Sequence, residues 1–140
     1  MIGKCCPPVP TVGKPFIFSS WYIQRSRHGA DPLQALSRVA DTRDLATCGM
    51  IAAEVGRGLR IPRFLDLYRR VWRDMLWIQS SEQVWDRTMR LAWDLDRKGT
   101  VLPIHDIHIA ACAMEISAAV LTCDRHFHQI PGLTVTDCLY

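Results

Sequence analysis

The sequence predicts an α/β domain of three layers, in which helices cover both faces of a short-stranded, mostly parallel sheet. Strand-like runs of four or five residues alternate with helical segments of ten or more, the pattern of such folds. A length of 140 residues, without repeats or a dividing linker, suits one domain. The composition, 49% hydrophobic and 22% charged, is that of a globular chain. We expect an irregular arm at residues 1–14 and a single domain at 15–140.

The first strand is expected in KPFIF (14–18), because aromatic and β-branched residues favour extended backbone. The following SSWYIQRSR (19–27) resembles a turn that enters a helix. A second helix is expected at 31–42, where Asp31 can serve as the N-cap and Pro32 takes the first helical position.

The middle of the chain predicts two strands with two helices between them. LATCG (45–49) is a short buried strand, and the helical spacing of 50–60 places Glu54 about one turn inside the next helix. The segment 62–74 repeats apolar residues with a period of 3.6, as an amphipathic helix does. MLWIQ (75–79) is the next strand candidate.

The last part predicts a capped helix followed by a helix, a strand and an edge strand. Ser80 and Ser81 can cap a helix that Gly99 closes. The elements after it are expected at 106–117 for the helix, 119–123 for the strand and 133–136 for the edge strand. The tryptophans at 72, 77, 85 and 93 fall at spacings typical of core residues, and they are interpreted as core packing rather than as platforms for nucleic-acid bases.

Composition excludes several classes of protein. No apolar run approaches the roughly 18 residues of a membrane span, and the N-terminus has no apolar run of signal-peptide length. The net charge of +3 allows a polyanionic partner without arguing for one. Because the six cysteines form no CxxC pair, a structural zinc site is not expected. We expect a reduced, cytoplasmic protein in which Cys48, Cys112, Cys123 and Cys138 are buried thiols.

Two aspartates flank the helix and strand of LPIHDIHIAACAMEISAAVLTCD (102–124). A helix that begins at Asp106 would travel roughly 17 Å, and the strand after it would return about 16 Å. Asp106 and Asp124 should therefore meet at the carboxyl edge of the sheet, where open α/β sheets bind ligands. Glu54 should lie near the same edge.

Three carboxylates at one edge repel one another unless a cation lies between them. A hard divalent cation with oxygen ligands, Mg²⁺ or Mn²⁺, meets that requirement. Taken singly, Asp106 could merely cap its helix, Asp124 could start a turn and Glu54 could be solvated. Their combined spacing favours a metal site.

The histidines are weaker candidates. His105 and His108 are three residues apart, whereas zinc-hydrolase helices use four-residue spacing with a glutamate between the histidines. His126 and Arg125, in an expected loop, are better suited to contact a phosphate group. Neither a GxSxG elbow nor a phosphate-binding glycine-rich loop occurs in the sequence.

The residues from 16 to 136 resemble a known family. The stretch D-x-x-IAA-x-A that begins at Asp106, the T-x-D of Thr122 and Asp124, and the IPGL at 130–133 resemble the C-terminal half of PIN domains, above all VapC-type toxins. The strand LATCG and the following helix with Glu54 resemble that family's second acidic motif.

This resemblance implies a metal-dependent endoribonuclease that cuts RNA as a homodimer and is blocked by a small VapB-like antitoxin. By position, Glu54, Asp106 and Asp124 match the acidic residues that bind Mg²⁺ or Mn²⁺, and Thr122 matches a hydroxyl beside them. The family's first strand normally ends in an aspartate, where this sequence has Phe18 or Ser19. Ser19 or Ser20 would then lie near the metal, and His126 stands where many relatives carry a further acid.

Two other readings remain open at this point. The chain could be a catalytically impaired PIN-like module that binds RNA or an antitoxin without cleaving. It could also be a phosphatase-like hydrolase at the same sheet edge, although it lacks the expected aspartyl nucleophile on the first strand.

Overall fold

The computed structural model describes residues 15–18 and 44–136. The predicted arm at 1–14, the turn into a helix expected at 19–27, the helix expected at 31–42, and Cys138 lie outside these residues. The described elements, in chain order, are β1 (Phe16–Phe18), β2 (Leu45–Cys48), α3 (Gly49–Gly58), α4 (Pro62–Arg73), β3 (Leu76–Ile78), α5 (Glu82–Arg97), α6 (Ile104–Glu115), β4 (Ala119–Leu121), the 3-10 helix η1 (Arg125–Gln129) and β5 (Val135–Thr136).

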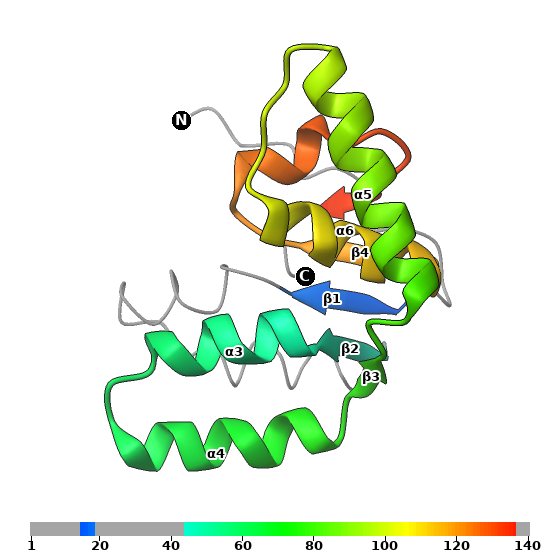
Figure 1. Ribbon diagram of the computed structural model, residues 1–140. Helices are drawn as coiled ribbons and strands as arrows, with labels where there is room; N and C mark the ends of the chain where they lie inside the picture. The colour runs from blue at the N-terminus through cyan, green and yellow to red at the C-terminus, as the bar shows by residue number, and fades with distance from the viewer. Residues whose placement is uncertain (1–14, 19–43, 137–140) are drawn as a thin grey trace, which may run out of the picture.

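The five strands form one sheet in the order β3-β2-β1-β4-β5, and every pairing is parallel (Figure 1). In register, Ile17 of β1 lies between Ala46 of β2 and Val120 of β4. Because the strands are parallel, their carboxyl ends meet at one edge of the sheet. The predicted α/β class with short parallel strands is therefore confirmed.

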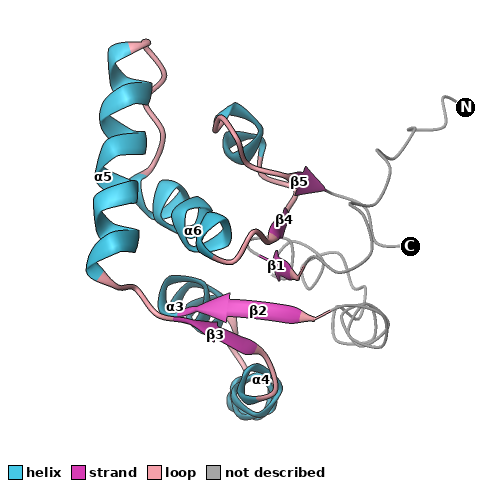
Figure 2. Ribbon diagram, turned by 90° about the vertical axis from the view of Figure 1, so that its right-hand side faces the viewer, coloured by secondary structure: helices cyan, strands magenta, loops and turns pink. Residues whose placement is uncertain are grey.

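Two helices cover one face of the sheet. Figures 1 and 2 show α3 and α6 on the same side of the strands, with α5 packed on the outside of α6 and α4 beside the β3 edge. The central strands are buried on both faces, as parallel strands usually are. The core fills the space between these strands and the inner sides of α3 and α6.

A histidine joins α6 to α5. His108 is 2% exposed, and its ring stacks on Trp85 of α5 with centroids 4.0 Å apart. Its Nδ1 lies 3.1 Å from Oγ1 of Thr88, and its Nε2 lies 2.9 Å from Oγ of Ser80. Burial lowers the pKa of His108, so that the neutral ring is favoured. His108 is thus a core residue with both ring nitrogens paired.

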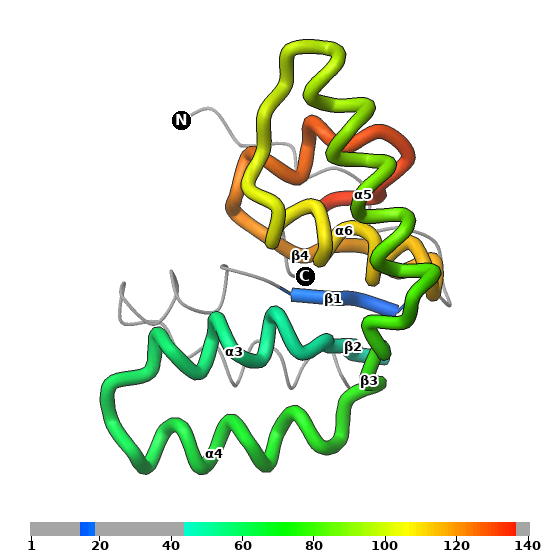
Figure 3. The backbone as a smooth tube through the Cα atoms, viewed as in Figure 1, coloured from blue at the N-terminus to red at the C-terminus, as the bar shows by residue number. Residues whose placement is uncertain are grey.

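The turn between α6 and β4 brings the chain back toward the start of α6 (Figure 3). The amide of Ala118 donates to the carbonyl of Ala113 at 2.8 Å, and that of Ser117 donates to Met114 at 3.2 Å. These two bonds form a Schellman motif, which requires a left-handed residue after the helix. Ser117 takes that role with φ of 53°, at a position where glycine is usual.

Several element boundaries differ from those predicted. Helix α6 begins at Ile104, so Asp106 lies within its first turn rather than at its start. Strand β4 ends at Leu121, two residues early, and the expected loop after it contains η1. The predicted cap of α5 is confirmed, since Oγ of Ser81 accepts a hydrogen bond from the amide of Val84.

The prediction that the tryptophans are core residues was wrong for three of them. Trp77, Trp85 and Trp93 are 46%, 48% and 57% exposed, whereas Trp72 packs against the core. The buried positions of α5 are instead Val84, Thr88 and Leu95.

The cysteine prediction was correct for two of three described positions. Cys48 and Cys112 are buried thiols, but Cys123 is exposed. Among the described helices, none has both the length and the apolarity needed to cross a membrane.

Candidate metal centre

Asp106 lies at the centre of the candidate site. It is the third residue of α6, where the positive end of the helix dipole favours a carboxylate, and it is only 5% exposed. Burying a carboxylate is costly unless it is paired. Its pairing comes from two histidines, with Oδ2 2.9 Å from Nδ1 of His126 and Oδ1 3.5 Å from Nε2 of His105.

Asp124 is held in place by the chain around it, three residues after the end of β4. Its amide donates to Oγ1 of Thr122 at 3.0 Å, and its Oδ1 accepts from the amide of His126 at 2.9 Å. Asp124 is thereby the N-cap of η1, and Phe127 anchors that 3-10 helix in the core at 1% exposure. The carboxylate therefore has a fixed position at the carboxyl edge of the sheet.

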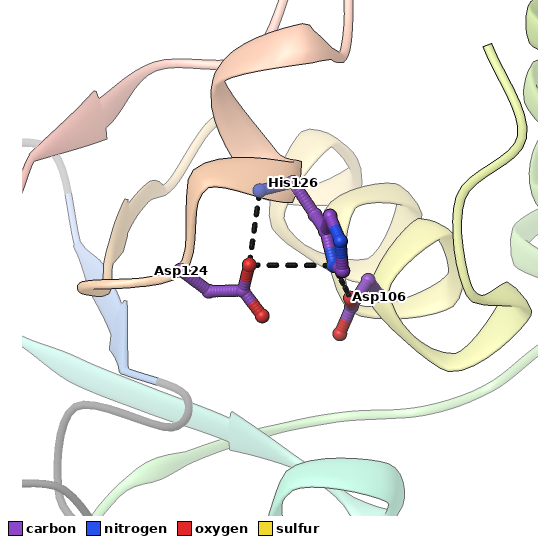
Figure 4. Close-up of side chains that lie close together, drawn as sticks. All are labelled: Asp106, Asp124 and His126. Carbon is purple, nitrogen blue, oxygen red and sulfur yellow. Dashed lines mark hydrogen bonds and ion pairs between the residues drawn. The ribbon is translucent and has the colours of Figure 1, made fainter.

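His126 brings the two aspartates together. Figure 4 shows its ring beside both carboxylates, with Nδ1 2.9 Å from Asp106 and 3.3 Å from Oδ1 of Asp124. One ligand atom from each of the three residues lies within 4.8 Å of the others. This cluster joins α6 to the segment after β4, although its aspartates are 18 positions apart in the sequence.

Glu54, on α3, approaches the cluster through His105, whose Nε2 lies 3.6 Å from Oε1 of Glu54. Burial raises the pKa of Glu54, and the charges of Asp106 and Asp124 raise it further, while His105 opposes the change. The charges of the two aspartates thus act on Glu54. The site therefore contains three carboxylates and two imidazoles. His105 contacts Glu54 and Asp106, and His126 contacts Asp106 and Asp124.

The donor set suits a divalent cation. In the part of the chain that the structure describes, the ion pairs of Glu54, Asp106 and Asp124 are all with histidine, and none is with arginine or lysine. Carboxylate oxygens are the preferred ligands of Mg²⁺ and Mn²⁺. A cation among these groups would offset their repulsion, so the residues present fit the metal that the sequence predicts.

The accessory residues that were predicted from the sequence do not all lie at the site. Thr122 lies beside the cluster but is buried, with Oγ1 accepting the amide of Asp124. Arg125 is exposed on η1. Phe18 is fully buried at the end of β1 and belongs to the core, so it has no role as a ligand. Ser19 and Ser20 lie outside the described residues.

His105 and His126 both contact Asp106, a role that the sequence pattern did not predict. Both lie within two positions of an aspartate of the site, in H-D at 105–106 and D-x-H at 124–126. That adjacency was the signal available in the sequence. It was weak because side-chain direction in an expected loop is not fixed by periodicity.

Comparison with known proteins identifies the family. A family model described as the PIN domain matches residues 17–133. The chain belongs to the PIN domain family. No curated protein matches the sequence significantly.

Solved structures of VapBC complexes share this PIN fold. DNA-bound VapBC from Salmonella typhimurium aligns with a TM-score of 0.72 and 20% identity, over 88% of this chain and 97% of that chain. VapBC2 from Rickettsia felis, bound to a promoter DNA fragment, gives 0.70 and 18%, over 86% and 96%. VapBC-1 from nontypeable Haemophilus influenzae gives 0.70 and 17%, over 88% and 97%. At these identities the likeness shows the fold.

Proposed function

We propose that this PIN domain is a metal-dependent endoribonuclease of the VapC toxin type that hydrolyses phosphodiester bonds of RNA. Glu54, Asp106 and Asp124 would hold Mg²⁺ or Mn²⁺. The observation that carries the proposal is the convergence of Asp106 and Asp124 at the carboxyl edge of the sheet, with Glu54 coupled to them. PIN-family membership supports the reaction class.

The residues of the site would have different roles because they are held in different ways. A bound divalent cation would lower the pKa of a water molecule for attack on phosphorus and would offset charge on the leaving oxygen. Asp106, buried at a helix N-terminus, and Asp124, fixed by its own backbone, hold their carboxylates with little freedom. The side chain of Glu54 is about one-third exposed. Burial is the main cause of its raised pKa, and the charges of Asp106 and Asp124, which a cation would offset, raise it further.

The proposed partners follow from the neighbouring structures. Those structures are VapBC complexes, so we propose that a small VapB-like antitoxin binds this chain and blocks the acidic site. We also propose that the protein acts in the cytoplasm, where its RNA substrate is present.

A homodimer is proposed on the exposed side of α5. Trp85, Met89 and Trp93 follow one another at four-residue spacing and are 48%, 61% and 57% exposed. Large exposed apolar side chains in a row are typical of protein interfaces. A second copy of the chain would cover them. Light scattering should give twice the 16.0 kDa of one chain, and a Met89→Glu variant should return the monomer mass.

The nuclease proposal is tested by incubating the purified chain with single-stranded RNA and Mn²⁺. We expect cleavage that EDTA stops and that an Asp106→Asn variant lacks. Asp66→Asn, at an exposed position of α4, is the matched control and should cleave as the parent does. Absence of metal uptake at millimolar Mn²⁺ would overturn the proposal. Binding of metal and RNA without cleavage would instead support the catalytically impaired module.

A further inference from the structure

His126 lies where a metal ligand would lie. Its Nδ1 is 2.9 Å from Oδ2 of Asp106 and 3.3 Å from Oδ1 of Asp124 (Figure 4). In an octahedral shell with ligands about 2.1 Å from the ion, neighbouring ligand atoms are about 3 Å apart. Nδ1 of His126 thus has the spacing of an adjacent ligand to each of the two carboxylate oxygens, and the three ligand atoms lie within 4.8 Å of one another.

The chain holds His126 in this position through its backbone. Its amide donates to Asp124 at 2.9 Å, and the next residue, Phe127, is buried in the core. The side chain is 43% exposed, so the ring is not enclosed by the core. A histidine side chain with this exposure contributes little to the packing of the core.

The other histidine of the site is placed differently. Nε2 of His105 lies 3.5 Å from Oδ1 of Asp106 and 3.6 Å from Glu54, whereas His126 approaches the other oxygen, Oδ2, of Asp106. Among the described residues, the group with ligand atoms close enough for a shared ion contains His126 and does not contain His105. His105 therefore pairs with Glu54 and Asp106 from outside the cluster.

The chemistry of a nitrogen ligand differs from that of a carboxylate. The last residue of β1 is Phe18, which is fully buried and whose phenyl side chain has no ligand atom. A neutral imidazole in place of a carboxylate keeps the number of ligand atoms and lowers the negative charge of the site. Mg²⁺ selects oxygen ligands and binds imidazole poorly, whereas first-row transition metals accept it readily.

We propose that His126 is a nitrogen ligand of the metal, beside Asp106 and Asp124, and that the site therefore prefers a transition-metal cation such as Mn²⁺ to Mg²⁺. This inference rests on the proposed function, because it concerns the ion that the nuclease site would hold. The carboxylates alone determine neither the full ligand set nor the choice between Mg²⁺ and a transition metal.

The test is electron spin echo spectroscopy of Mn²⁺ bound to the full chain, which detects coupling to a directly coordinated ¹⁴N nucleus. We expect this coupling in the parent protein and in His128→Ala, a control on an exposed histidine of the same 3-10 helix. His126→Ala should lose the coupling and should bind Mn²⁺ more weakly, by roughly tenfold or more, since one ligand is gone. Circular dichroism establishes that each variant is folded.

A second variant tests the preference between metals. His126→Asp restores an all-oxygen set, so the ratio of Mn²⁺ to Mg²⁺ affinity, measured by competition, should fall by roughly tenfold. Bound Mn²⁺ without ¹⁴N coupling in the parent, or coupling that persists in His126→Ala, would overturn this inference and leave the nuclease proposal standing. Coupling lost in His105→Ala alone would also overturn it. No Mn²⁺ binding by the parent would overturn the nuclease proposal itself.

Discussion

Nδ1 of His108 on α6 lies 3.1 Å from Oγ1 of Thr88 on α5, and the direction of this hydrogen bond follows from its neighbours. The Thr88 hydroxyl donates to the carbonyl of Val84 at 2.8 Å, so its oxygen must accept from Nδ1–H of His108. Nε2 then carries no proton and accepts from the Ser80 hydroxyl at 2.9 Å. The bond fixes the neutral ring and holds α6, which carries Asp106, against α5.

Replacing Thr88 by valine should destabilise the fold. The change keeps the shape of the side chain but removes the acceptor, leaving a buried donor of His108 unpaired at a cost of about 1–3 kcal/mol. Urea unfolding should show the loss as a lower midpoint concentration, while the slope of the unfolding free energy against urea concentration stays unchanged. Thr134→Val, at a half-buried position after η1, is the control and should shift the midpoint little. Equal midpoints for parent and Thr88→Val would contradict this assignment.

The buried ring of His108 should make stability depend on pH. Its pKa in the fold is lowered from the ordinary 6.5 because burial disfavours the charged ring. As the pH falls below about 6.5, the unfolded chain takes up a proton that the folded chain does not, so folding loses up to about 1.4 kcal/mol per pH unit until the lowered pKa is reached. Above pH 7 this contribution is constant.

His108→Gln, which cannot titrate, isolates that contribution. Its free energy of unfolding, followed by urea titration from pH 7.5 to 5, should fall less steeply than that of the parent. His128→Gln, at an exposed position, should keep the slope of the parent. Parallel curves for the parent and His108→Gln would show that this ring does not cause the dependence.

Ser117→Gly should stabilise the protein. Ser117 has φ of 53°, a left-handed conformation that costs a residue with a side chain about 1–2 kcal/mol. Glycine removes that strain, and its greater freedom in the unfolded chain takes back part of the gain, so a net of about 0.5–1 kcal/mol is expected. Thermal unfolding of Ser117→Gly and Ser117→Ala measures it, and alanine should give no gain. A lower melting temperature for the glycine variant would contradict the prediction.

The sequence was sufficient to predict where the two aspartates meet. The lengths of a helix and a strand fix how far the chain travels out and back, so Asp106 and Asp124 could be brought to one edge without a structure. The exact start of α6 did not matter, because a shift of two residues moves Asp106 by only about 3 Å along the helix.

Helix rotation was harder to predict than helix position. In α5 both Val84 and Trp85 belong to apolar stripes at helical spacing, but their side chains point about 100° apart. The structure buries Val84, Thr88 and Leu95 and exposes the stripe of Trp85. Because the buried stripe has the polar Thr88 at its centre, the stripe that contains Trp85 is the more apolar of the two in the sequence. The polar partner that justifies burying Thr88 is His108, on a different helix, and local pattern does not reveal it.

Phe18→Asp and Ser19→Asp separate the two positions at which the missing acid of β1 could stand. Phe18 is fully buried in the core, so an aspartate there removes an aromatic ring and buries an unpaired charge. Phenylalanine-to-alanine changes in cores cost about 3–5 kcal/mol, and the charge adds to that cost. Phe18→Asp should therefore unfold at much lower urea concentration and gain no metal affinity.

In the sequence, Ser19 directly follows Phe18, the last residue of β1. As the counterpart of the first-strand aspartate that PIN domains normally carry, an aspartate at position 19 should raise the affinity for Mg²⁺ by roughly tenfold, because it adds a charged oxygen ligand. Ser19→Asn, which adds the same shape without the charge, is the control. Calorimetric titration with Mg²⁺ measures the change. Unchanged affinity in Ser19→Asp, in a folded protein, would show that the acid of β1 has no counterpart at this position and that the metal site is complete without it.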